Sequence, residues 1–319
     1  MGSTDAGMHP DARSPAAWWG LIRDTVKGWL GDFAPSMGAG IAYYTAFSIG
    51  PLLLIVIAIA GLFYGEDAAS GYVHAQVGDL LGRDGADAVR SMVARAGETE
   101  DGILGPLISL GLLLVGATTV FAELQSDLDR IWKAPAAKQR EGVWGLLRRR
   151  VLSLGLVVSI GFLMLVSLLV SAALAALSKW WSGWLEDLAW LMHGLDFVVS
   201  IAAVTLMFAL MYKILPRVKI AWRDVWVGSL VTALLFTIGK FLVGLYIGHS
   251  KVASGFGAAG SVMVVLIWVY YSAQIFLLGA EFTWVYTHRY GSRRGQAQPS
   301  DTRDSLEEST VDPHPQPVR

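Results

Sequence analysis

Two charged side chains lie within apolar segments of this sequence, where an ionisable group is best placed to do chemistry. Lys240 and Glu281 are each flanked by apolar residues in runs long enough to cross a bilayer. A charge in hydrocarbon is costly and marks a functional site by default. Tyr270, Gln274 and Glu281 are spaced by four and seven residues, so they share one helix face. We expect Glu281 to hold a proton or a cation and Lys240 to meet an anionic group.

An earlier apolar run supplies further polar groups at the expected depth of Glu281. Tyr43, Tyr44 and Ser48 lie in this run, and together with Tyr270 and Gln274 they are the expected lining of a polar path. The alternative is that these groups only join helices through interhelical hydrogen bonds, which requires no substrate. The residues expected to hinge or kink the helices are Pro51, Gly257 and Gly260.

The sequence offers no support for several other kinds of chemistry. It has no cysteine, and its six histidines are scattered along the chain. A nuclease that works through metal ions needs clustered ligands in a water-accessible site. The sequence also lacks a P-loop, a G-x-S-x-G and an H-E-x-x-H motif. We therefore expect no enzyme activity, no metal site and no cofactor.

The composition is that of a membrane protein. Of the 319 residues, 54% are apolar and 16% are charged, whereas about 25% are charged in an ordinary soluble domain. The net charge of -1 gives no reason to expect a nucleic-acid partner. We predict an all-α fold with six transmembrane helices, near Ala39–Tyr64, Ile103–Phe121, Val151–Leu177, Asp196–Leu215, Val225–Ile247 and Gly257–Tyr286.

The distribution of Lys and Arg predicts how these helices are oriented. Basic residues are concentrated before the first run, in the second and fourth connections and just after the last run, and they are sparse in the other connections. Cytoplasmic connections carry the excess of Lys and Arg. Both termini are therefore expected in the cytoplasm, as an even number of spans requires.

The segments outside the six runs have distinct characters. Residues 15–33 carry Trp18, Trp19, Ile22 and Trp29 at helical spacing, the pattern of an amphipathic helix lying in the cytoplasmic membrane interface. That helix is either an anchor or a gate in front of the first span. Residues 65–102 are expected to form a helical external loop. We expect a membrane domain over residues 15–290, and disordered tails over residues 1–14 and 291–319.

Three sequence blocks resemble a known family. Residues 42–53, Ala-Tyr-Tyr-Thr-Ala-Phe-Ser-Ile-Gly-Pro-Leu-Leu, are similar to the first-span signature of the YihY/BrkB family of bacterial inner-membrane proteins. The block Leu-Asp-Arg-Ile-Trp at 128–132 and the last-span sequence ending in Gly-Ala-Glu at 279–281 are similar as well. The resemblance implies a six-span protein of the inner membrane with cytoplasmic termini. Some members carry the label ribonuclease BN, but the family provides no established catalytic residues.

These observations lead to one preferred function and one competitor. We expect a transporter that does not hydrolyse ATP and that moves a lipid or a small solute between the first, fifth and sixth spans. The competing hypothesis is a scaffold for envelope assembly that transports nothing. Membrane lipids are the expected partners, no nucleic acid is expected, and the sequence makes no prediction of the oligomeric state.

Overall fold

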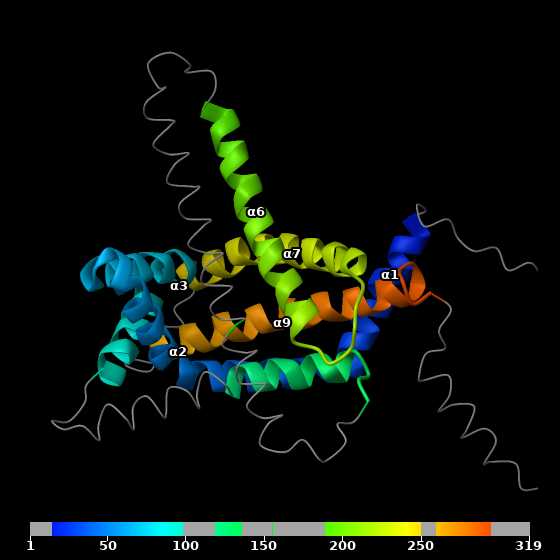
Figure 1. Ribbon diagram of the computed structural model, residues 1–319, viewed down its shortest axis with the longest axis horizontal. Coiled ribbons are helices and arrows are strands. Elements are labelled where there is room, and N and C mark those ends of the chain that lie inside the picture. Colours follow the sequence, from blue (N-terminus) through cyan, green and yellow to red (C-terminus); the bar gives the residue numbers. More distant parts are fainter. Residues whose placement is uncertain (1–14, 98–118, 136–154, 156–188, 250–259, 295–319) are drawn as a thin grey trace, which may run out of the picture.

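The computed structural model describes residues 15–97, 119–135, 155, 189–249 and 260–294, and these residues form helices and turns, without a β-strand. The helices are α1 (Pro15–Gly31), α2 (Ala34–Tyr64), α3 (Glu66–Gly97), α6 (Ala189–Ile214), α7 (Trp222–His249) and α9 (Gly260–Arg289). Residues 119–131 form a further helix. Figure 1 shows how these elements are arranged. The all-α prediction is thus confirmed for the described part of the chain.

Among the described residues, three segments are long and apolar enough to cross a membrane. They are Phe197–Ile214 in α6, Trp222–Tyr246 in α7 and Val262–Arg289 in α9. The predicted first run lies within α2, which is a further long apolar helix. The predicted span Val151–Leu177 and most of Ile103–Phe121 lie outside the described residues, apart from residue 155 and residues 119–121.

Helix α9 is the central element of the fold. It contacts α1, α2, α3 and α7, and α7 in turn contacts α6. The largest apolar core joins α9 to α2, α6, α7 and the helix at 119–131, and it includes Leu128, Tyr212, Val225 and Leu277. The N-terminal half of α6 extends away from this core (Figure 1), where Phe197 and Val198 are exposed.

Close approach of small residues fixes the pairing of α7 with α9. A Cβ atom on Gly228 would overlap the side chain of Thr283, and a Cβ atom on Gly279 would overlap the side chain of Thr232. Each threonine hydroxyl donates to a backbone carbonyl four residues earlier in its own helix, at 2.6 to 2.8 Å. Small residues at the contact let the two backbones approach closely, as is typical of helix pairs in membranes.

Tyr212 of α6 contacts both α7 and α9 near these close approaches. Its hydroxyl donates to the carbonyl of Phe276 at 2.7 Å and lies 3.1 Å from the hydroxyl of Thr232. One fully buried side chain therefore connects α6, α7 and α9.

Helix α3 forms one end of the bundle and changes direction along its length. A Cβ atom placed on Gly78 would lie 3.8 Å from the Cβ atom of Ala86, whereas eight residues of a straight helix advance about 12 Å. The second arm of α3 packs Ala88 and Val89 against Val243 of α7 and against Val265 and Trp268 of α9.

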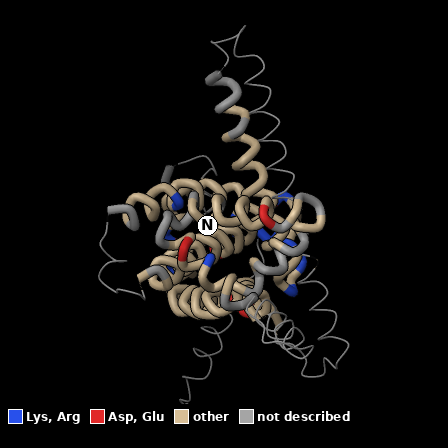
Figure 2. Tube along the Cα trace, turned by 90° about the vertical axis from the view of Figure 1, so that its left-hand side faces the viewer, with Lys and Arg blue, Asp and Glu red and all other residues tan. Residues whose placement is uncertain are grey.

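The other end of the bundle holds α1, two connections with basic residues and the start of the C-terminal tail. Arg217 pairs with Asp129 at 3.1 Å, and Arg293 donates to the carbonyl of Lys219 at 3.0 Å. Arg293 also lies over the ring of Trp132. These connections and the start of the tail are the segments that the charge count assigned to a common side. Figure 2 shows that most of the described trace is neither acidic nor basic.

Candidate functional site

The break between α1 and α2 carries a strained residue beside an acidic one. Helix α1 ends at Gly31, and Asp32 and Phe33 form the connection to α2. Phe33 adopts φ 60° and ψ 35°, the left-handed region that is uncommon for residues other than glycine. Arg130 lies 5.8 Å above the exposed Phe33 ring. This sharp turn directs Asp32 toward the end of the helix at 119–131.

A second strained residue faces Asp32. Lys133 follows the helix at 119–131 and adopts φ 50°, and its ammonium group forms an ion pair with the Asp32 carboxylate. The turn is closed by the Ala134 amide, which donates to the carbonyl of Asp129 at 2.8 Å. Within the described residues, Phe33 and Lys133 are the only two residues other than glycine with positive φ. Such strain persists where the surroundings impose it, and it is concentrated at functional sites.

Glu281 of α9 completes the group. Its side chain is 1% exposed, and Asp32 lies within side-chain hydrogen-bonding reach of it. Lys133 is the nearby positive charge. Two carboxyl groups and one ammonium group thus lie close together where α1, α9 and the helix at 119–131 meet. We call Asp32, Lys133 and Glu281 the acidic junction.

A glycine makes room for Glu281. A Cβ atom on Gly28 of α1 would lie 2.8 Å from Oε2 of Glu281, so a larger residue would push the carboxyl group aside. The other oxygen, Oε1, is buried and has no hydrogen-bond partner among the described residues. An acceptor in this state is costly unless a proton, an ion or a ligand satisfies it.

The acidic junction belongs to a longer polar face of α9 that lies against glycines. Gln274 lies against Gly38 at the start of α2, and its amide is 3.5 Å from the carbonyls of Ala34 and Pro35. Near the other end of this face, Arg289 extends past Gly20 of α1.

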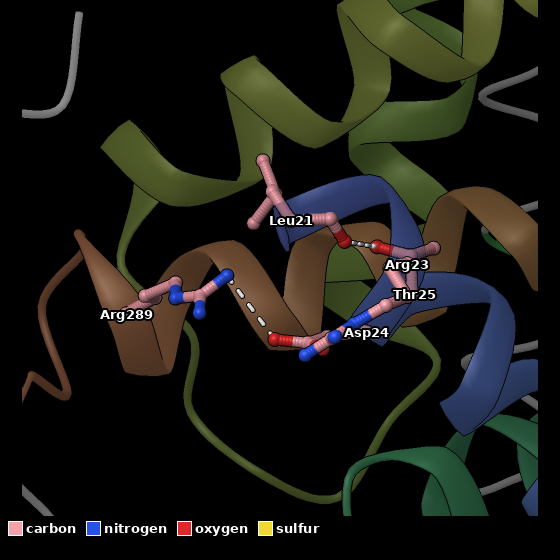
Figure 3. Close-up of polar contacts among 5 residues, drawn as sticks. All are labelled: Leu21, Arg23, Asp24, Thr25 and Arg289. Atoms are coloured by element: carbon pink, nitrogen blue, oxygen red, sulfur yellow. Dashed lines mark hydrogen bonds and ion pairs between the residues drawn. The ribbon is translucent and has the colours of Figure 1, made fainter. Parts of the chain in front are cut away.

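An ion pair holds α1 against α9 at this point. Figure 3 shows Arg289 reaching Asp24 of α1, with 3.1 Å between the charged atoms. Arg23 also lies 3.5 Å from Asp24, and Thr25 donates to the carbonyl of Leu21 at 2.8 Å. Glu281 therefore lies between two polar contacts of α9, one from Gln274 to the start of α2 and one from Arg289 to α1.

The remaining predicted path residues do not gather around Glu281. Tyr43 is 58% exposed, and Tyr44 and Tyr270 are exposed as well. Lys240 is exposed on α7, so the structure does not bring the two charges of the apolar runs together. Ser48 is buried, but its hydroxyl donates to the carbonyl of Tyr44 in its own helix at 2.8 Å.

The predicted hinge residues are placed as follows. Pro51 lies within α2, which is helical on both sides of this residue. Gly260 is buried and is the first residue of α9. Gly257 lies outside the described residues.

Sequence reasoning missed the partners of Glu281. Asp32 and Lys133 lie 101 residues apart in the sequence. Each lies outside the apolar runs, where a charged residue indicates no particular function. One signal in the sequence pointed to this region. The Leu-Asp-Arg-Ile-Trp block at 128–132, which resembles the family, ends immediately before Lys133.

A second buried acid lies on the helix at 119–131. Asp127 is 6% exposed, and its Oδ2 atom has no hydrogen-bond partner among the described residues. Burial and the nearby Glu123 raise the pKa of Asp127 from 3.8 to about 7, although Arg130 acts in the opposite direction. Glu123 itself lies against Gly40 of α2.

The chemistry available at this end of the bundle is the exchange of protons and ions. Among the described residues, no group of three or more His, Cys, Asp and Glu side chains is arranged to hold a metal ion. What the site provides is a carboxyl pair with a lysine, held between α1, α9 and the helix at 119–131.

Long apolar helices with a charged junction at one end are those of a helical membrane protein, and comparison with known proteins assigns its family. The family model described as "Virulence factor BrkB" matches residues 25–304. The chain therefore belongs to the BrkB family.

Its relatives are bacterial membrane proteins. The chain is 28% identical over 253 residues to a "UPF0761 membrane protein" of Aeromonas salmonicida. These 253 residues cover 76% of this chain and 80% of the relative. It is 27% identical over 260 residues to a protein of the same description from Ralstonia nicotianae, over 78% of this chain and 54% of the relative. A third, from Tolumonas auensis, is 27% identical over 184 residues, 55% of this chain and 56% of the relative. The chain thus spans little more than half the length of the last two. No solved structure matches the chain.

Proposed function

We propose that this protein is a transporter that moves a lipid or a small solute without hydrolysing ATP, and that the acidic junction is its charge-bearing element. The observation that carries the proposal is the Oε1 atom of Glu281, which is buried without a hydrogen-bond partner among the described residues. A carboxyl group with an unsatisfied acceptor, close to a second carboxyl and a lysine, is suited to taking up and releasing a proton or a cation.

The proposed topology has six spans in the bacterial inner membrane, with both termini in the cytoplasm. The end that holds α1 would then face the cytoplasm, and α1 would be the interfacial helix. Its exposed face supports this placement, because Trp18, Trp19, Ile22 and Leu30 are exposed while Leu21 and Thr25 are buried. Tryptophan and aliphatic side chains on one face are typical of helices at membrane interfaces.

The substrate path in this proposal runs along the polar face of α9 between α2 and α1. It differs from the path expected from sequence, because α1 replaces the Tyr43, Tyr44 and Ser48 region opposite Glu281. The proposed partners are membrane lipids and the transported lipid or solute. The proposal includes neither a nucleic acid nor a catalytic reaction.

The test measures movement of a fluorescent phospholipid between leaflets of liposomes that contain the purified protein. We expect Glu281→Gln to slow this movement by tenfold or more, because glutamine keeps the shape of the side chain but cannot exchange a proton. Glu123→Gln is the matched control, since it removes a carboxylate that is not in the acidic junction. If the wild-type protein gives no more movement than empty liposomes, phospholipid is not the substrate. Flux of a small solute would then be measured with the same variants.

The competing scaffold function predicts a different outcome. Under that hypothesis the acidic junction only holds helices together, and Lys133→Met should destabilise the fold by about 1–2 kcal/mol because it leaves a partly buried carboxylate unpaired. Adding Asp32→Asn should restore stability, and under the scaffold hypothesis neither the wild-type protein nor this double variant moves phospholipid or solute. In the transporter, the double variant is expected to be stable but slow.

A further inference from the structure

The described part of the chain contains a pocket at the end of the bundle opposite the acidic junction. It has a volume of about 300 Å³ and lies between α2 and the two arms of α3. Its apolar lining includes the buried residues Ile57, Ala86 and Val89. The bend of α3 creates the pocket, because residues 67–77 and 86–93 face it from opposite arms.

Charges of opposite sign line this pocket from the two arms. Asp67 lies on the first arm and Arg90 on the second, and both are exposed. Within the residues that the structure describes, neither side chain forms an ion pair, with the other or with a third residue. The dipole of α3 favours Asp67 in the first turn, but it does not account for Arg90 across the pocket. Ser70 and His74 add hydrogen-bonding groups to the first arm.

The volume sets the size of a ligand. A water molecule occupies about 30 Å³ in the liquid, so the pocket has room for on the order of ten groups of this size. An apolar lining with a few polar groups near the opening is the usual form of a small-molecule site. A ligand that satisfies all three features has a positive group for Asp67, a negative group for Arg90 and an apolar group for the apolar lining.

We infer that the pocket binds a small zwitterion with an apolar group, in the manner of an apolar amino acid or the headgroup region of a zwitterionic lipid. This inference concerns a different end of the molecule and does not rest on the proposed transport path. The acidic junction and the pocket share no residue.

Because the chain contains no cysteine, a single introduced thiol reports on the pocket without background. Ser70→Cys places the thiol at the pocket, and Ser91→Cys places it on the same helix at an exposed position outside the lining. The rate of labelling by a water-soluble thiol reagent is measured in the full-length protein with L-leucine as the probe. We expect L-leucine to slow labelling of the Ser70→Cys variant and to leave labelling of the Ser91→Cys variant unchanged.

Matched probes and variants then test the two charges separately, each charge variant being made in the Ser70→Cys background. 4-Methylpentanoate lacks the ammonium group and 3-methylbutylamine lacks the carboxylate, and each is expected to protect the pocket thiol at a concentration about tenfold higher than L-leucine. In Asp67→Asn, L-leucine should protect no better than 4-methylpentanoate. In Arg90→Gln it should protect no better than 3-methylbutylamine. Arg23→Gln, on α1 at the other end of the bundle, should change nothing.

Lysophosphatidylethanolamine separates a lipid source from a soluble one. Protection by this lipid at a lower concentration than L-leucine would assign the site to a lipid headgroup, and the reverse order would assign it to a free zwitterion. Both results require the two charge variants to weaken protection. Three results would overturn the inference. They are equal protection by all probes, equal protection by L-leucine of the Ser70→Cys and Ser91→Cys thiols, and no protection by any probe.

Discussion

Replacement of Asp127 by asparagine should change how the stability of this protein depends on pH. Burial, reinforced by Glu123, raises the pKa of Asp127 from 3.8 to about 7. The folded protein therefore holds a proton between about pH 4 and pH 7 that the unfolded chain has lost, so stability falls as pH rises through this range. A shift of about three units corresponds to about 4 kcal/mol at about 1.4 kcal/mol per unit. We expect the wild-type protein to lose about 2–4 kcal/mol of unfolding free energy between about pH 4.5 and pH 8.

Asparagine cannot ionise, so Asp127→Asn should have a flatter profile and exceed the wild-type stability near pH 8. Unfolding in mixed micelles, followed by tryptophan fluorescence at several pH values, measures both profiles. Asp87→Asn is the control, because Asp87 is exposed on α3 and its replacement should leave the profile unchanged. Parallel profiles for the wild type and Asp127→Asn, or a variant that is less stable near pH 8, would refute the reasoning.

Two further variants test the packing of α9. Gly28→Val should destabilise the protein by about 1–3 kcal/mol and displace Glu281, because its Cβ atom would lie 2.8 Å from the Glu281 carboxyl oxygen. Thermal unfolding measures the loss of stability. The control is Gly31→Val, because a Cβ atom at Gly31 meets no atom within 4 Å. Tyr212→Phe should cost about 1–2 kcal/mol through the hydrogen bond lost to the Phe276 carbonyl, while Tyr246→Phe, at an exposed position, should cost almost nothing in the same assay.

The described helices could be predicted from sequence because their apolar runs are long. The runs beginning at Asp196 and Val225 differ from α6 and α7 by only a few residues at most ends. The structure also gathers at one end the segments that the excess of Lys and Arg had assigned to a common side. Length and charge distribution are properties of single segments, so a sequence reports them directly.

The surroundings of Glu281 could not be predicted, because they depend on how helices rotate about their axes. Helix α2 is apolar on nearly all sides, so its sequence does not indicate that Tyr43 faces outward and Gly38 inward. Asp32 and Lys133 meet only because two turns with left-handed residues direct them toward each other. Neither turn contains a glycine at the strained position that would mark it in the sequence.

The reciprocal pairs of Gly228 with Thr283 and Gly279 with Thr232 have a mechanical consequence. Each helix inserts one threonine into the other, so sliding α7 along α9 in either direction drives a methyl group or a hydroxyl against backbone. A shift by one helical turn, about 5.4 Å, would require both threonines to leave their places at once. Helices α7 and α9 therefore form one rigid unit, and any change of shape falls to the elements that contact this pair from outside.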